Sequence, residues 1–97
     1  MIHRLEPADR VKLIETRLKQ SLDVQQLLII DDSAKHAGHA GAKERGGGHF
    51  TIKIVSEQFQ NKSAVQRHRM IYSALGDAME TEIHALSIKA LTPDEDR

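Results

Sequence analysis

The stretch Gly48-His49-Phe50-Thr51-Ile52-Lys53-Ile54-Val55, followed by a turn and by a helical run from Ser63 to Met79, decides the fold. Its apolar residues Phe50, Ile52 and Ile54 recur at every second position, which is the period of a strand with one buried face. We therefore predict a strand–turn–helix unit and place the other elements around it.

The helical run begins with a clear start signal. Ser63 and Gln66 have the spacing of a capping box, in which each side chain accepts a hydrogen bond from the main-chain amide of the other residue. Gly76 lies inside the predicted helix and weakens it slightly. The residues that share the face expected to lie on the sheet are Ala64, Val65, His68, Ile71, Tyr72, Leu75, Ala78 and Met79.

Two elements precede this unit. Pro7 suits the first turn of a helix, and apolar residues then recur at helical spacing until the helix ends before Asp23. The segment Val24–Ile30 is predicted to be a strand. Its apolar run Leu27–Ile30 favours burial on both faces, hence helices over at least part of the second face. The alternative is a partly exposed edge strand with a dimer contact.

The remaining segments are a long loop, a third strand and a tail. Residues 32–47 form a polar, glycine-rich connection that is too long for an ordinary hairpin, so we expect it to be functional or disordered. The segment Ile83–Ala90 alternates as a strand. Residues 94–97 are expected to be a frayed, disordered tail.

The element order, helix–strand–strand–helix–strand, defines the fold class. A right-handed crossover makes the second and third strands parallel, and the long loop makes the first two antiparallel. We predict one domain over residues 1–97, an α+β fold with a three-stranded mixed sheet and both main helices on one face. The open face is expected to carry polar residues such as Thr51, Lys53 and Lys89.

Composition excludes several classes of function. The 97 residues carry no net charge, which argues against binding nucleic acid mainly through phosphate neutralisation. The chain has no cysteine, so it forms no disulfide scaffold and no thiolate metal site unaided. No apolar run is long enough to cross a bilayer and the N-terminus does not resemble a signal peptide, so we expect a cytoplasmic protein with no membrane partner. No group of acid, base and nucleophile is apparent, so we expect no catalytic residue and no enzyme activity.

Six histidines are the unusual feature of the composition. His68 lies on the predicted apolar helix face, which favours a hydrogen-bonded structural residue. His49 is either a surface residue or a loop anchor. His36 and His39 have a spacing found in metal sites, although this pattern alone favours a solvated loop. His84 begins the third strand, with its ring on the side of the following apolar residues. Because parallel strands start at the same edge of a sheet, we expect it to meet the loop histidines there.

Several segments together resemble the BolA family, and the resemblance covers nearly the whole chain. It implies a class II KH-like fold, in agreement with the element order. The segments that carry the resemblance are Asp31-Asp32-Ser33, His36-Ala37-Gly38-His39, Gly48-His49-Phe50, Arg67-His68-Arg69 and His84-Ala85-Leu86.

The resemblance also implies a partner and a cofactor. BolA-like proteins pair with monothiol glutaredoxins around a bridging [2Fe–2S] cluster, to which the glutaredoxin supplies a cysteine and glutathione a second thiolate. The BolA-like chain would supply His84 and a second ligand from the long loop, where His36 matches best and His39 is the reserve. This implies a role in iron–sulfur cluster trafficking or iron regulation. The isolated chain is expected to hold no cluster and to be a monomer or a weak homodimer.

A second function, transcriptional regulation through DNA binding by the KH-like fold, is also attributed to some BolA relatives. Arg67, Arg69 and Lys62, with Lys43 and Arg45, could form a basic patch near the turn before the helix. The alternative is that these are solvated charges balanced by nearby glutamates, which the zero net charge favours.

Overall fold

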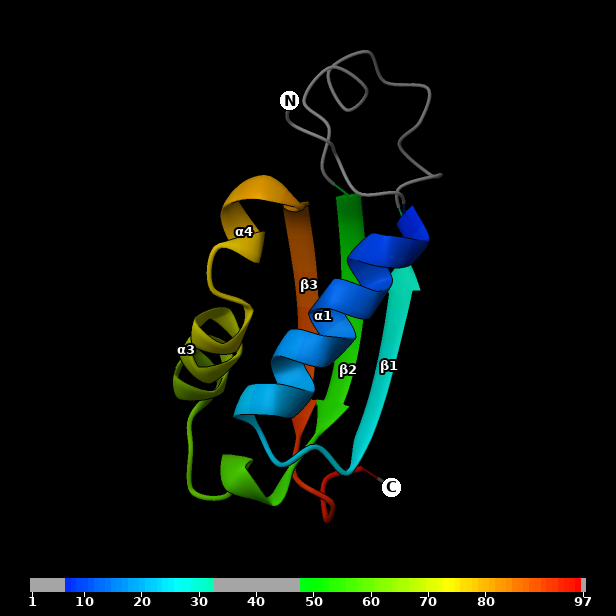
Figure 1. The fold of residues 1–97 in the computed structure, drawn as a ribbon. Helices are drawn as coiled ribbons and strands as arrows, with labels where there is room; N and C mark the ends of the chain where they lie inside the picture. Colours follow the sequence, from blue (N-terminus) through cyan, green and yellow to red (C-terminus); the bar gives the residue numbers. More distant parts are fainter. Residues whose placement is uncertain (1–6, 33–47, 97) are drawn as a thin grey trace.

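The computed structural model describes residues 7–32 and 48–96 of the chain. In order, the elements are α1 (Pro7–Ser21), β1 (Gln26–Asp31), β2 (Gly48–Val55), the short 3₁₀ helix η2 (Glu57–Phe59), α3 (Ala64–Leu75), α4 (Ala78–Thr81) and β3 (Ile83–Leu91). Figure 1 shows the three strands side by side, with α1 lying across them and α3 and α4 beside it. Within the described residues, no helix combines the length and the apolar character needed to cross a membrane.

The sheet has the predicted mixed topology. Its strand order is β1-β2-β3. β1 runs antiparallel to β2, with Leu27 opposite Ile54, and β2 runs parallel to β3, with Phe50 opposite Leu86. The α+β class is therefore confirmed.

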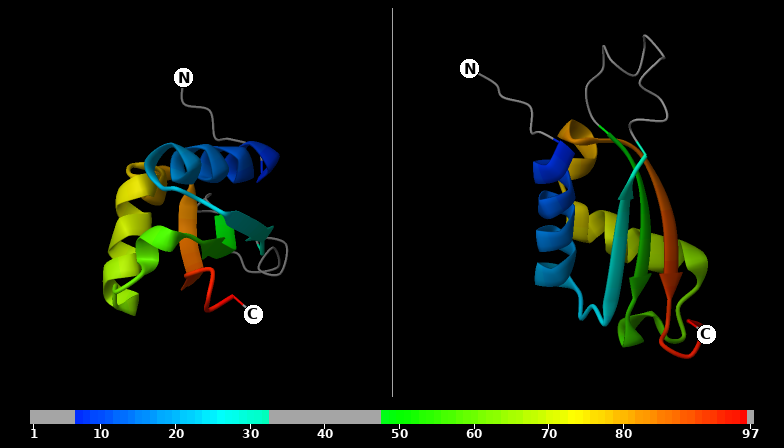
Figure 2. Two further views of the ribbon diagram at one scale, coloured as in Figure 1. Left: turned by 90° about the horizontal axis from the view of Figure 1, so that it is seen from below. Right: turned by 90° about the vertical axis from the view of Figure 1, so that its right-hand side faces the viewer.

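The core lies between the two main helices and one face of the sheet. The inward residues of β2 are Phe50, Ile52 and Ile54, as its alternation predicted, and they are fully or almost fully buried. Both main helices contribute to the same cluster, α1 through residues such as Leu18 and α3 through residues such as Ile71. Seen from below, α1 and α3 cross at a steep angle (Figure 2). Each large apolar side chain buried here stabilises the fold by roughly 1.5–3 kcal/mol.

β1 differs from the prediction of burial on both faces. It is an edge strand, and its outward residues Leu28 and Ile30 are 54% and 43% exposed. The physical reason is that α1 and α3 both contribute to one core cluster, on the face of β2 that carries Phe50 and Ile52. The apolar run identified a strand but could not show how many layers cover it. Thr51 and Lys53 of β2 lie on the same open face as Leu28 and Ile30, as expected.

The buried face of α3 also differs from the prediction. Val65 and Tyr72 are 59% and 42% exposed, whereas Ala74 is buried together with Ile71 and Leu75. The helix is therefore rotated toward α1, which is in contact with it, and Ala74 faces the end of α1 across a shallow pocket. The spacing of apolar residues within α3 could not predict this contact with α1.

Gly76 ends the helix, so the prediction of one helix through this residue was wrong. It is the C-cap of α3 with φ of +56°, and α4 begins two residues later. A positive φ suits glycine, which has no side chain to clash with the main chain. The capping box of Ser63 and Gln66 is present at the other end of α3, as predicted.

Residues 94–96, expected to be disordered, are held by specific contacts. The carboxylate of Glu95 accepts a hydrogen bond from the Thr92 amide at 2.8 Å and pairs with Arg67. Asp96 forms an ion pair with Lys53 at 2.6 Å. Arg97 lies outside the described residues.

Candidate functional site

One end of the sheet brings together the starts of β2 and β3 and the end of β1. Gly48 lies opposite Ile83 at the start of the parallel pair. The Asp32 amide donates to the His49 carbonyl at 2.7 Å, so the end of β1 is tied to the start of β2. This end of the sheet, which we call the histidine rim, carries His49 and His84 and lies at the top of Figure 1.

An irregularity in the β2–β3 pairing sets the position of His84. The register shifts between Gly48 and His49, which lie opposite Ile83 and Ala85 respectively. Ile83 is in the core and Leu86 packs against it, so His84 and Ala85, both exposed, lie between two inward-facing residues. Strict alternation would allow only one residue there. The prediction that the His84 ring lies on the side of the apolar residues was therefore wrong, because a bulge breaks the alternation.

The exposed ring of His84 instead lies next to the ring of His49. The two ring centroids are 5.1 Å apart and the ring planes are inclined by 54°. The Nε2 atom of His49 is buried, whereas His84 is exposed. His49 is therefore the member of the pair nearer the protein interior, and His84 is the member nearer the solvent. The expected pairing with His36 and His39 concerns residues outside the described part of the chain.

Sequence reasoning left the role of His49 open and did not pair it with His84. The signal was present, because each histidine is the second residue of its strand and the two strands are parallel neighbours. The missing step was the register, which a single sequence does not reveal.

Two neighbouring imidazoles are suitable ligands for iron, zinc or copper. Within residues 7–32 and 48–96, however, no group of three or more histidine, aspartate or glutamate side chains could hold a metal ion. The nearby Asp32 carboxylate accepts a hydrogen bond from the Thr51 hydroxyl at 2.5 Å. The described part of the rim therefore offers two imidazole rings, without a complete ligand set for a metal ion among the described residues.

The other predicted structural histidine, His68, is only partly buried on α3. Its ring makes no hydrogen bond to any residue in the described part of the chain. The hydrogen-bonded core role that we expected is therefore not seen there. The reason is the rotation of α3, which places His68 at the margin of the core.

Arg67 is a structural residue rather than an available cation. Its guanidinium donates to the Ala90 carbonyl at 3.0 Å and lies over the Phe59 ring, 5.9 Å from the centroid. It also pairs with Glu95, and its side chain is only 13% exposed. The hydrogen bond from Arg67, followed by the hydrogen bond from the Thr92 amide, lowers the pKa of Glu95 from 4.5 to about 2.

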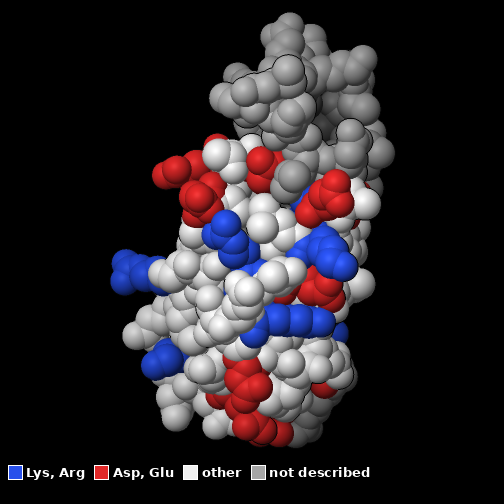
Figure 3. Space-filling view, in the orientation of Figure 1, with Lys and Arg blue, Asp and Glu red and all other residues white. Residues whose placement is uncertain are grey.

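Arg69 and Lys62 are exposed, and neither side chain forms an ion pair with a described residue. Basic and acidic side chains are interspersed over the face shown in Figure 3, so no large basic surface is visible there. Of the predicted basic patch, the described residues thus retain Arg69 and Lys62 as exposed cations, whereas Lys43 and Arg45 lie outside the described part of the chain.

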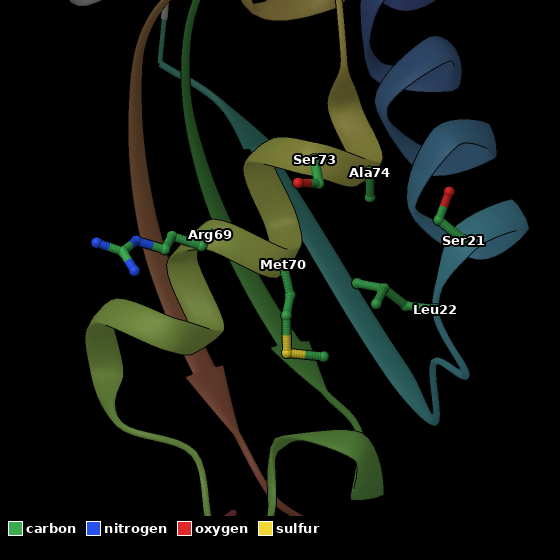
Figure 4. A pocket seen from close by; sticks show the side chains of 6 residues that line it. All are labelled: Ser21, Leu22, Arg69, Met70, Ser73 and Ala74. Carbon is green, nitrogen blue, oxygen red and sulfur yellow. The ribbon is translucent and has the colours of Figure 1, made fainter.

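A shallow pocket of about 410 Å³ lies where the end of α1 meets α3. Figure 4 shows Leu22 and Met70 on either side of this space, whereas the guanidinium of Arg69 points away from it. The pocket is lined by Ser21, Leu22, Arg69, Met70, Ser73 and Ala74. It is remote from the histidine rim, because it lies at the opposite end of α1.

Relatives with known names align with most of this chain. "SufE-like protein 1, chloroplastic/mitochondrial" of Arabidopsis thaliana is 45% identical over 84% of this chain and 23% of its own length. "Protein BOLA1, chloroplastic" of the same plant is 42% identical over 90% of this chain and 56% of its own length. The chain thus spans well under two thirds of these two relatives. "DNA-binding transcriptional regulator BolA" of Escherichia coli is 34% identical over 84% of this chain and 74% of its own length.

Solved structures show the same fold. The BolA domain of SufE1 from Arabidopsis thaliana superposes with a TM-score of 0.76 at 42% identity, covering 94% of this chain and 99% of that domain. BolA1 from Mus musculus superposes with a TM-score of 0.71 at 32% identity, covering 97% of this chain and 72% of that one. The sequence matches the family described as BolA-like protein over residues 18–95. The chain therefore belongs to the BolA family.

Proposed function

We propose that this chain is an adaptor that binds a monothiol glutaredoxin and supplies two imidazoles to a [2Fe–2S] cluster shared with that partner. The observation that carries the proposal is the 5.1 Å separation of the His49 and His84 rings at the histidine rim. His84 is exposed, so a partner can reach it. The role that follows is in iron–sulfur cluster trafficking or iron regulation.

The available ligands fit a shared cluster better than one held by this chain alone. The sequence has no cysteine, and the described rim has two imidazoles without a third metal ligand. A glutaredoxin cysteine and glutathione would supply the two thiolates that the chain lacks. When bound, a cluster with both imidazoles on one iron would have a raised reduction potential.

The structure also bears on which residue is the second imidazole. The family resemblance implies His36, with His39 as the reserve, and both lie outside the described residues. The described part of the chain supports His49, because this ring already neighbours His84. We therefore propose His84 as the outer ligand and test the other three histidines against one another.

The test is a titration of the chain with a monothiol glutaredoxin, glutathione, iron and sulfide, followed by visible absorbance and circular dichroism. We expect His84→Ala to abolish the cluster spectrum of the complex, and one of His49→Ala, His36→Ala and His39→Ala to weaken it strongly. His68→Ala is the matched control, since this histidine lies on α3, and it should leave the spectrum unchanged. An unchanged spectrum with His84→Ala would overturn the proposal.

Calorimetry without iron separates partner binding from ligation. If His84 is a ligand and not a docking residue, His84→Ala should retain most of the affinity for the iron-free glutaredoxin. Loss of both binding and spectrum would assign His84 to the protein interface instead.

DNA binding is the second candidate, because the Escherichia coli relative is named a DNA-binding transcriptional regulator. Among the described residues of the predicted basic patch, Arg69 and Lys62 are exposed and available for phosphate contacts. The test is fluorescence anisotropy with duplex DNA at several salt concentrations, comparing the unmodified chain with Arg69→Ala and Lys62→Ala. We expect each variant to lower the salt slope by about 1 if its cation contacts a phosphate. A flat salt response of the unmodified chain would remove this candidate.

A further inference from the structure

On the outer edge of β1, the main-chain groups of Leu27 and Ile29 are paired by no described residue. The Asp32 amide donates a hydrogen bond to the His49 carbonyl. Because every second residue of an antiparallel strand hydrogen-bonds to the same neighbour, the main-chain groups of Leu28 and Ile30 also point toward β2. The groups of Leu27 and Ile29 point the other way, and no hydrogen bond to them from a described residue is seen. Such an edge can accept a further strand.

Between Gln26 and Ile30, the sequence of β1 carries no charged residue and no proline to protect its edge. Gln26–Asp31 contains no lysine, arginine or proline, and its pairing with β2 is regular. Leu28 and Ile30 project from it on the open face of the sheet. The opposite edge of the sheet is different, because Arg67 donates to the Ala90 carbonyl and thereby occupies part of β3.

We propose that the edge of β1 pairs with β1 of a second copy of this chain, in antiparallel orientation about a two-fold axis at Ile29. The two three-stranded sheets would then form one continuous six-stranded sheet. An antiparallel two-fold contact uses the same strand on both copies, so a single self-complementary edge suffices.

The register follows from which side chains the pairing brings together. An axis at Ile29 places Leu28 of each copy opposite Ile30 of the other, so all four exposed apolar side chains meet in one patch. An axis at Leu28 gives an equally long overlap but places Ile30 opposite Gln26 and buries less apolar surface. The axis at Ile29 is therefore favoured.

The charges of β1 are compatible with this register. β1 carries no cation. Its acidic end would lie next to the glutamine end of β1 in the other copy, with Asp32 opposite Gln26. An axis moved to Asp31 would instead place two aspartates opposite each other, which is unfavourable.

The contact is short, so the dimer should be weak. A pairing of five residues from each edge falls among interfaces smaller than about 1,200 Å², which are typically transient. His84 lies on β3, two strands away and roughly 10 Å from β1. The inference therefore does not depend on the proposed ligation, and its failure would leave that proposal intact.

The first test measures the molar mass of the full chain by sedimentation equilibrium, from about 10 µM to about 1 mM. We expect the mass to rise toward that of a dimer with concentration, and to stay monomeric in the variant Leu28→Lys with Ile30→Lys. The matched control is Val65→Lys with Tyr72→Lys, which alters two similarly exposed apolar residues on α3 and should still dimerise. A monomeric unmodified chain throughout this range would overturn the proposal, as would dimerisation that only the control variant abolishes.

The second test uses the absence of native cysteine to check the register. Leu28→Cys and Ile30→Cys are prepared separately, confirmed as folded by circular dichroism, and oxidised alone and as a mixture. The axis at Ile29 predicts efficient cross-linking only in the mixture, because residues 28 and 30 face each other across a non-hydrogen-bonded pair. Strong cross-linking of Leu28→Cys alone would overturn this register, and no cross-linking in any sample would overturn the interface.

Discussion

The guanidinium of Arg67 donates two hydrogen bonds to the carboxylate of Glu95, at 2.6 and 3.2 Å. This pair joins the first turn of α3 to the turn that follows β3. Because the same guanidinium also bonds the Ala90 carbonyl and covers Phe59, one side chain connects a helix, a strand and the C-terminal turn.

Replacing Arg67 by alanine should therefore destabilise the fold. Loss of the hydrogen bond to Ala90 and of the contact with Phe59 should lower the free energy of unfolding by about 1–3 kcal/mol. The measurement is the urea midpoint at neutral pH. Arg69→Ala is the control, because Arg69 is exposed and should change the free energy by less than about 0.5 kcal/mol. Equal effects of the two substitutions would contradict the structural role of Arg67.

The Arg67–Glu95 pair also predicts a dependence of stability on pH. The pKa of Glu95 is lowered from 4.5 to about 2 in the folded chain, so its ionised form stabilises the fold above pH 4.5. This contribution should disappear as the pH falls from 4.5 to about 2. We expect it to be modest, because the carboxylate is exposed and solvent screens the pair.

The measurement compares the unmodified chain with Glu95→Gln by urea unfolding across that range. The glutamine variant should be less stable at neutral pH, and the difference should shrink as the solution is acidified through this window. Glu57→Gln is the control at an exposed glutamate that forms no ion pair with a described residue. A difference that stays constant down to the lowest pH would argue against the pair as its source.

Much of the fold could be predicted because its signals are local. The alternation of Phe50, Ile52 and Ile54 identified β2, and Ser63 with Gln66 identified the start of α3. A strand–helix–strand order then required a parallel pair, since the crossover connection has a preferred hand. Each of these steps uses residues that are close in sequence.

The errors lie where structure depends on distant contacts. The exposure of Leu28 depends on how many helices cover the sheet, and the exposure of Tyr72 depends on where α1 meets α3. The order of the C-terminal turn depends on Arg67 and Glu95, which are 28 residues apart. A pattern within one segment contains no information about such contacts.

The candidate site was predicted in part for the same reason. Topology placed His84 at the edge where β2 begins, which is correct. The bulge that exposes its ring beside His49 depends on the fit of β2 to β3, and sequence alternation assumes that no bulge is present.

The capping box of α3 makes a separate prediction. The Ser63 hydroxyl accepts from the Gln66 amide at 3.1 Å, and the Gln66 side chain accepts from the Ser63 amide at 2.8 Å. Ser63→Ala removes the first of these bonds and should lower the free energy of unfolding by about 1 kcal/mol. Ser73→Ala in the same helix is the matched control and should be neutral or slightly stabilising, because alanine favours helix interiors. Chemical denaturation of both variants measures the difference, and equal values would remove the cap as a contributor.

Gly76 makes the last prediction, because its conformation requires glycine. Its φ is +56° and its ψ is −132°, a region that L-residues with a side chain rarely adopt. Gly76→Ala should therefore lower the free energy of unfolding by about 1–3 kcal/mol, measured by urea or thermal unfolding.

A Cβ at this position would also lie 3.2 Å from Nη1 of Arg17, so crowding could contribute to the loss. The Arg17 guanidinium donates to the Leu75 carbonyl at 3.1 Å and pairs with Asp77 at 3.0 Å. A shift of only a few tenths of an ångström at the end of this side chain relieves the crowding, which makes backbone strain the expected cause. A double-mutant cycle with Arg17→Ala separates the two effects. Strain predicts that the losses from Gly76→Ala and Arg17→Ala add. Recovery of stability in the double variant would instead show that the new side chain collides with Arg17.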